Sequence, residues 1–344
     1  MLSRLRELGA FALVGGLVWS APASAQNVAD FYKGKQMEII TGGTPGSIYD
    51  HWSRALGHHM GKHLPGNPNF VVRNMPGGGH ITATNYLANQ SPRDGTVLGL
   101  VSRNMPLQDL VGNSAVRFKS SEFGWIGSPE MTNRGCVAYK NAKVKKAADL
   151  YQTELLVAGS GAGTAVSTTP ILLAKLLGLK LKLVEGYQGG PEIFLAMERG
   201  EVEGVCQTMA AIESTGPGWI RDGKLNVLFN LEKDPLPGMN APSVMTLTKT
   251  DEERAIIAFY NSSAELGRPV MTTPGIPADR LTALRRAFDA TMKDKDFVAE
   301  AKRLTGLDVM PMTGEQVDAV AKRIAQTPKA IMDKTVAIVG SLGE

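Results

Sequence analysis

Three glycine-containing loops carry the residues whose types and spacing could do chemistry. They cover 42–47, 159–164 and 189–191, and each separates an apolar strand-like segment from a helix-like segment. The first N–H groups of a helix have no partner within the helix, and the helix dipole adds positive potential there, so such loops bind anions. The three loops therefore predict binding of a small anion through backbone N–H groups and hydroxyls.

The first loop also contains a helix-start signal. Ser47 and Asp50 stand three residues apart, which predicts a reciprocal capping box, and apolar residues then recur on one face up to Gly61. A capping box with a glycine turn also occurs in helices that bind nothing, so this loop alone leaves a purely structural role open.

Strand-like and helix-like segments alternate along the chain, which favours an α/β fold. The length of 344 residues suits two domains better than one core. We expect two lobes with a mostly parallel sheet in each, and loops at the carboxyl ends of strands facing the ligand. Helices are expected to begin near Thr169-Pro170 and to span about 313–339, with the terminal helices on the first lobe.

The N-terminus is typical of a secretory signal peptide. Arg4 and Arg6 precede an apolar run over 8–19, and Ala23-Ser24-Ala25 supplies small residues before Gln26. We expect residues 1–25 to be removed and the mature protein to be periplasmic. The formal net charge of +4 and the lack of a basic stripe with interleaved aromatics argue against a nucleic-acid partner.

Cys136 and Cys206 are the two cysteines of the chain. In an oxidising compartment they could form one disulfide, and two separate buried thiols are the equal alternative. The sequence leaves this pairing open.

An enzyme is the rival class. All five histidines lie between His51 and His80, and His59 and His63 are spaced to face one way on a helix and hold a metal, but no third ligand stands at a suggestive spacing. Loop 159–164 lacks the dinucleotide fingerprint, and Ala158 stands where a nucleophile elbow at Ser160 would need glycine. We therefore expect no catalytic residue, no metal and no cofactor.

A series of motifs covers nearly the whole mature chain in a specific order. It comprises TPGSIYD at 44–50, NMPGGG at 74–79, PRDGTVLGL at 92–100, GSGAGT at 159–164, YQGGPE at 187–192, GEVEGV at 200–205 and GIPADRLTALRRAFDATMKD at 275–294. In these motifs the chain resembles the substrate-binding receptors of tripartite tricarboxylate transporters, the Bug-type or TctC-like extracytoplasmic solute receptors.

The resemblance implies a type II-like periplasmic binding protein whose two lobes close like a flytrap over a small carboxylate. It implies a signal peptide over 1–25, a discontinuous first lobe over 26–128 plus 243–344, and a second lobe over 129–242. The residues it places at the ligand are Thr44, Gly46, Ser47, Tyr49 and Asp50 in the first lobe, and Ser160, Ala162, Gly163, Thr164, Tyr187, Gln188, Gly189, Gln207 and Thr208 in the second.

Ser47 stands where the family usually has a second glycine, and Tyr49 could stack on an aromatic acid, although packing is the commoner role of an aromatic at a helix start. The implied function is a monomeric receptor that delivers a small organic carboxylate to the permease subunits of a tripartite transporter. Reporting the ligand to a membrane sensor uses the same closure, and a metal-dependent periplasmic enzyme using 51–80 is the less favoured alternative.

Overall fold

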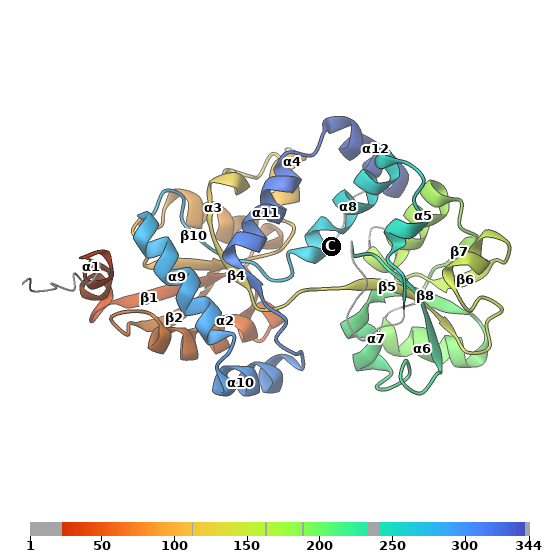
Figure 1. Cartoon of the computed structure of the whole chain (residues 1–344), viewed down its shortest axis with the longest axis horizontal. Coiled ribbons are helices and arrows are strands. Elements are labelled where there is room, and N and C mark those ends of the chain that lie inside the picture. The colour runs from red at the N-terminus through yellow and green to blue at the C-terminus, as the bar shows by residue number, and fades with distance from the viewer. Residues whose placement is uncertain (1–22, 112, 162–163, 188, 233–240, 341–344) are drawn as a thin grey trace, which may run out of the picture.

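The structure has two lobes, each built on one β-sheet with helices on both faces (Figure 1). It is a computed structural model that describes residues 23–111, 113–161, 164–187, 189–232 and 241–340. Most of the predicted signal peptide lies outside these residues. The first helix starts at Ala23, so the predicted cleavage point after Ala25 falls within it, and the leader stays a prediction.

The first sheet has the strand order β11-β4-β10-β3-β1-β2. Its strands are β1 (Gln36–Thr41), β2 (Asn69–Asn74), β3 (Val97–Leu100), β4 (Gly124–Ser128), β10 (Val270–Thr272) and β11 (Met312–Thr313). Strand β1 pairs in parallel with β2 and β3, whereas β10 is antiparallel to β3 and β4, and β11 is antiparallel to β4.

The second sheet has the order β7-β6-β8-β5-β9. Its strands are β5 (Arg134–Tyr139), β6 (Leu155–Ala158), β7 (Leu181–Val184), β8 (Gly204–Thr208) and β9 (Leu225–Asn230). Strand β6 is parallel to β7 and β8, and β5 is antiparallel to β8 and β9. The α/β two-lobed fold is confirmed, and both sheets are mixed. Strands β10 and β11 run against the other four strands of the first sheet, and β5 runs against the other four of the second.

Helices on both faces bury each sheet. Around the first sheet these are α1 (Ala23–Tyr32), α2 (Ile48–His59), α3 (Ile81–Asn89), α4 (Met105–Leu110), α9 (Ala278–Thr291), α10 (Lys295–Thr305) and α11 (Gly314–Ala325). Around the second they are α5 (Ala165–Leu177), α6 (Gly190–Arg199), α7 (Met209–Thr215), α8 (Asp251–Glu265) and α12 (Lys329–Val339). The 3₁₀ helices are η1 (Met60–His63), η2 (Gly78–His80), η3 (Ser120–Glu122), η4 (Ala147–Tyr151) and η5 (Val244–Leu247). Among the described residues no helix is long and apolar enough to cross a membrane.

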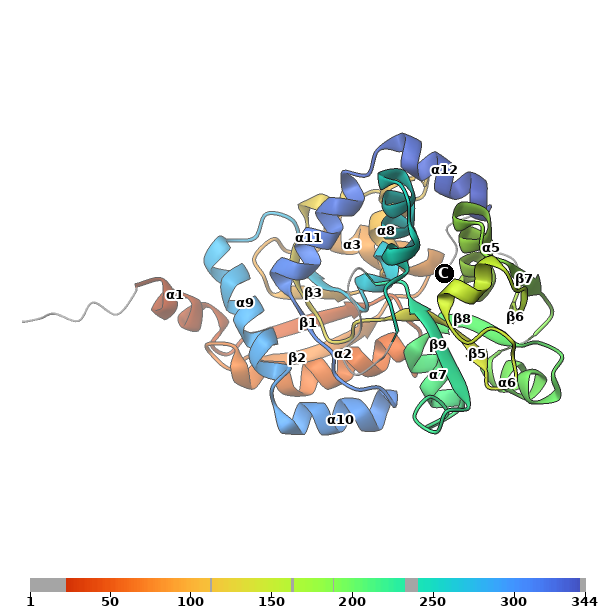
Figure 2. The same ribbon diagram turned by 45° about the vertical axis from the view of Figure 1, so that its right-hand side comes forward.

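Two helix predictions differ from the structure. The helix expected over 313–339 is two helices, because Pro328 lacks an N–H and begins a new helix as its N-cap. The second of them, α12, lies beside α5 and α8, so it packs on the second lobe rather than the first (Figures 1 and 2). Helix α5 starts at Ala165 rather than near Pro170, because Thr164 caps it by accepting a hydrogen bond from the Ser167 N–H.

The chain crosses between the lobes through the segment that joins β4 to β5, and α8 leads back toward β10 (Figure 1). The two crossings touch. Arg268 Nε donates to a carboxylate oxygen of Glu130 at 2.7 Å, and the Arg268 N–H donates to Ser128 Oγ at 2.9 Å. Gly267 has φ +62°, and a Cβ there would meet the Glu130 carbonyl oxygen at 1.6 Å, so no other residue fits. The predicted boundaries 26–128 plus 243–344 and 129–242 stay a prediction.

Cys136 and Cys206 form a disulfide. They are directly opposite each other on β5 and β8, and both are fully buried. The bond closes a loop of 70 residues within the second lobe. The structure thus answers the question that the sequence left open.

Replacing both cysteines by alanine should lower the free energy of unfolding. A loop of this length loses closure entropy worth about 4 kcal/mol when cross-linked in the unfolded chain. Urea unfolding of the double variant and of oxidised wild type measures the difference. Reduced wild type is the control and should unfold near the variant. Equal midpoints for oxidised wild type and the variant would contradict the bond.

Candidate functional site

The start of α2 is held by Ser47 and Asp50, though not as a reciprocal capping box. Ser47 Oγ accepts from the Asp50 N–H at 3.3 Å, as predicted. The Asp50 carboxylate instead accepts from the Gly46 N–H at 2.9 Å. The carboxylate thereby folds the loop back onto the helix.

Asp50 is buried at 2% exposure and fully engaged by the protein. Its carboxylate accepts from Arg54 Nε and from Asn74 Nδ2, each at 2.9 Å, and Asn74 Nδ2 also donates to the Gly43 carbonyl. Burial alone would raise the pKa of Asp50, but the hydrogen bonds from Arg54, Gly46 and Asn74 outweigh it and hold the pKa below its usual value. Asp50 therefore shapes the loop, and its negative charge makes it a poor direct ligand for an anion.

Donors remain at the tip of this loop. The N–H groups of Ile48 and Tyr49, the first two of α2, have no hydrogen-bond partner in the described chain. Thr44 and Gly46 are exposed beside them. These two N–H groups are the orphan donors that a helix start offers to an anion.

Tyr49 is packed against protein groups. Its ring makes an edge contact with His80, with centroids 4.4 Å apart, and the Arg268 guanidinium lies 4.7 Å from its centroid. His80 has a φ of +75° at the end of the 75–80 loop. The tyrosine thus links the first-lobe loop to the crossing segment that holds Arg268.

The second-lobe loop already holds a carboxylate of the chain. Glu185, which follows β7, accepts from the Gly161 N–H at 2.9 Å and from Ser167 Oγ at 3.0 Å. Ser160 and Thr164, two predicted site residues, bond to each other at 3.0 Å between their hydroxyls. The N–H groups of Ala165 and Val166 have no partner among the described residues.

The remaining predicted residues are dispersed. Ala162, Gly163 and Gln188 lie outside the described residues. Tyr187 is partly buried and its N–H donates to the Gly159 carbonyl, and Gly189 is the N-cap of α6.

Gln207 and Thr208 end β8 as expected. Gln207 is 8% exposed and its amide nitrogen has no partner, while Thr208 Oγ1 accepts from the Ala211 N–H as the cap of α7. No hydrogen bond, ion pair or ring contact joins the loop at 44–50 to that at 159–164 in the described parts of the chain.

Sequence reasoning missed three arginines between these loops. Arg103 follows β3, Arg134 begins β5, and Arg268 precedes β10. With Glu130 and Thr132 they form a set that we term the junction cluster. An arginine directly at the end of an apolar strand, as in the Ser102-Arg103-Asn104 run, was the available signal.

Three of the five histidines contact acids at the start and in the middle of α10. His58 and His59 both contact Glu300, at 2.9 and 2.6 Å, and His63 lies 2.9 Å from Asp294. These contacts hold α10 against α2 and η1. Among the described residues no group of three potential ligands is arranged to hold a metal ion.

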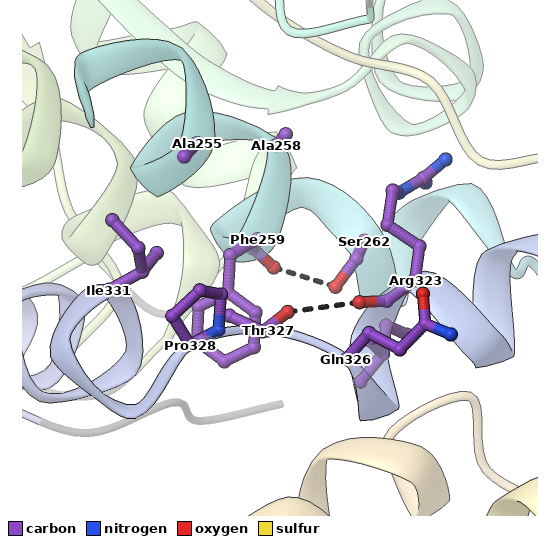
Figure 3. A pocket seen from close by; sticks show the side chains of 10 residues that line it. Ala255, Ala258, Phe259, Ser262, Arg323, Gln326, Thr327, Pro328 and Ile331 are labelled. Carbon is purple, nitrogen blue, oxygen red and sulfur yellow. Dashed lines mark hydrogen bonds between the residues drawn. The ribbon is translucent and has the colours of Figure 1, made fainter. Parts of the chain in front are cut away.

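An apolar cavity of about 310 Å³ lies away from the predicted site, between α8, the end of α11 and the start of α12 (Figure 3). Phe259 and Ile331 line it. The Ser262 hydroxyl donates to the Phe259 carbonyl within α8, and the Thr327 hydroxyl donates to the Arg323 carbonyl of α11. None of the predicted ligand residues contributes to it.

Several solved structures share this fold. A TctC solute-binding protein from Polaromonas is 19% identical with a TM-score of 0.68, over 87% of this chain and 98% of that one. The periplasmic binding protein BugD is 17% identical with a TM-score of 0.53, over 88% and 98%. An R. palustris protein with adipate is 16% identical with a TM-score of 0.52, over 89% and 97%. No family model matches the chain, and no curated protein does either.

Glu185→Ala should raise the affinity of the second-lobe loop for external anions. Removing the carboxylate frees the Gly161 N–H and the Ser167 hydroxyl next to the start of α5. Sulfate at about ten times its dissociation constant would then add about 1.4 kcal/mol of stability, measured by thermal unfolding in sulfate against chloride at equal ionic strength. The exposed Glu154→Ala has the same change of charge and is the control. Equal sulfate responses in the two variants would contradict the role of Glu185.

His80→Asn should flatten the pH dependence of stability. Burial, with a smaller contribution from Arg268, lowers the pKa of His80 to about 4. The unfolded chain takes up this proton near pH 6.5 and the folded chain does not, so wild type loses stability as the pH falls from 6.5 to 4, by at most about 3 kcal/mol. Asparagine tolerates the positive φ.

Urea unfolding at pH 7, 5.5 and 4 compares the two proteins. The difference in unfolding free energy should move in favour of the variant as the pH falls. A constant difference across the three pH values would contradict the buried neutral histidine.

Proposed function

We propose that this chain, which has the two-lobed fold of TctC- and BugD-type periplasmic binding proteins, is a periplasmic receptor for a small organic carboxylate. The lobes would close over the ligand, and the loaded receptor would deliver it to the membrane subunits of a tripartite tricarboxylate-type transporter. The receptor would carry out no chemistry. Family membership, export through residues 1–25 and the monomeric state belong to this proposal.

One observation carries the proposal. Each lobe presents a helix start with two N–H groups that have no partner in the described chain: Ile48 and Tyr49 on α2, and Ala165 and Val166 on α5. A carboxylate satisfies such donors through charge-assisted hydrogen bonds, which gain strength when closure removes water. The adipate named with the R. palustris protein of this fold supports a carboxylate as the ligand class.

The ligand would bind first to one lobe and then contact the other as the lobes close. Because no contact joins the described residues of the two predicted loops, we interpret the structure as a form in which the lobes are apart. A ligand held first on α2 would favour the closed form through its additional contacts with the second lobe.

A thermal-shift screen tests the function. Mono-, di- and tricarboxylates, including adipate and malate, are compared with sugars and cationic amino acids on the mature protein. A carboxylate at about a hundred times its dissociation constant adds roughly 2.7 kcal/mol. A response confined to sugars or cations would overturn the proposal.

Ile48→Pro tests the α2 donors for any acid that stabilises the protein. Proline is well accepted at the first position of a helix, and Ser47 has the extended ψ of 162° that a residue before proline requires. The substitution removes one free N–H and also trims the packing of the Ile48 side chain on the first-lobe core. Loss of the N–H should weaken binding about tenfold or more. Lys295→Pro at the start of α10 is the matched control. Unchanged affinity in Ile48→Pro would exclude the α2 start as a ligand site.

A further inference from the structure

The guanidinium of Arg134 is a buried cation that forms no ion pair and no hydrogen bond in the described chain. It is 5% exposed, and its Nε is buried without a hydrogen bond. The described chain places no carboxylate within ion-pair distance of its guanidinium and no acceptor within hydrogen-bond distance of it. Its nearest recorded companion is the Tyr260 ring, 5.7 Å from the guanidinium carbon, and the Tyr260 hydroxyl is already bonded to Thr168 and Thr169.

The nearby acid is engaged elsewhere. Glu232 accepts from Asn261 Nδ2 at 3.2 Å and from the backbone N–H of Arg134. Burial raises the pKa of Glu232 above its usual value in spite of these bonds and of the nearby Arg134 charge. Glu130, the acid of the junction cluster, is used by Arg268 at 2.7 Å. Neither carboxylate forms an ion pair with Arg134.

Arg103 adds a second positive charge. Its guanidinium donates one recorded hydrogen bond, from Nη1 to Thr132 Oγ1 at 3.0 Å, and makes no ion pair with a described residue. Burial lowers the pKa of Arg103, and the charges of Arg134 and Arg268 lower it further. Two arginines are therefore gathered where the lobes meet without enough negative charge to balance them.

Other unsatisfied polar atoms lie at the same end of the strand pair. Asn133 Oδ1 and Gln207 Nε2 are both buried without partners. Thr208 pairs with Arg134 across β5 and β8 and shares its face of the sheet, whereas Gln207 pairs with Gly135 and its side chain leaves the opposite face. Buried polar groups without partners are rare in folded proteins, so the unsatisfied Arg134 Nε indicates a missing polar guest on its own face of the sheet.

Packing alone gives a poorer account of these observations. A guanidinium needed only to cover Tyr260 could be replaced by an apolar side chain without the cost of burying a charge. The buried charge lies on the same face of the sheet as the predicted residue Thr208, and binding of an anion there would offset the cost of burying it.

We propose that Arg134 and Arg103 form an anion site at the lobe junction, which takes a carboxylate or similar oxyanion group of the bound solute. This site deepens the proposed function and rests on it. The planar guanidinium of Arg134 suits a two-point contact with such a group. The α2 start would then bind another part of the same ligand.

Arg134→Gln tests the site, with Arg103→Gln as a second variant and the exposed Arg221→Gln as the matched control. Each is unfolded thermally without ligand, in sodium sulfate against sodium chloride at equal ionic strength, and with adipate. A binding role predicts two effects of opposite sign. Arg134→Gln should melt higher than wild type without ligand, because an unpaired buried charge is gone, and should lose its sulfate and adipate response at least tenfold in affinity.

The possible outcomes distinguish a failure of the proposed anion site from a failure of the proposed receptor function. If adipate stabilises wild type and Arg134→Gln equally, the junction site is wrong and the receptor function stands. If no carboxylate binds but the sulfate response of wild type disappears in Arg134→Gln and not in Arg221→Gln, the site stands and the carboxylate receptor is wrong. A lower melting temperature for Arg134→Gln with an unchanged sulfate response would show a packing role and overturn the proposal. Arg103→Gln keeps the test valid should Arg134→Gln fail to fold.

Discussion

The geometry of the molecule depends on the contact between its two crossing segments. Glu130 and Arg268 pair there, and Gly267 lets the two backbones approach more closely than any side chain would permit. A buried ion pair adds little net stability because both charges lose their hydration, so its value here is positional. It fixes which residues of each lobe face the other, and both candidate ligand regions are placed relative to it.

In two of the loops that precede helices, a carboxylate of the chain itself accepts a hydrogen bond from a backbone N–H. Asp50 binds the Gly46 N–H, and Glu185 binds the Gly161 N–H. Both loops are thereby held in shape before any ligand is present, and the N–H groups left over are those at the first two positions of each helix. Binding a ligand to preorganised donors loses less conformational entropy than binding it to donors that must first be ordered.

Local patterns predicted much of this arrangement. Alternating apolar runs located most strands, glycines located the loops, and Ser47 is the cap of α2 as its spacing indicated. The family resemblance placed Asp50 at the ligand, whereas Arg54 and Asn74 engage its carboxylate. Asn74 lies on β2, and no local pattern shows that contact.

The junction cluster could not be predicted from the sequence either, because its residues are far apart along the chain. Arg103, Arg134 and Arg268 come from three strands of two sheets, so their proximity arises only when both lobes are assembled. The reversed strands β5, β10 and β11 were not identified from the sequence, because an apolar strand pattern carries no information about strand direction. Helix α12 can pack on the second lobe because the helix breaks at Pro328. The apolar pattern continues across this break, so the sequence pattern did not indicate it.

The disulfide has a consequence for strand alignment. Cys136 and Cys206 lie two residues along β5 and β8 from the opposed pair of Arg134 and Thr208, on the same face. A slip of one residue between these strands would turn Arg134 to the other side of the sheet. Once the sulfurs are joined, that slip is covalently forbidden, so oxidation selects the one alignment in which Arg134 shares a face with Thr208.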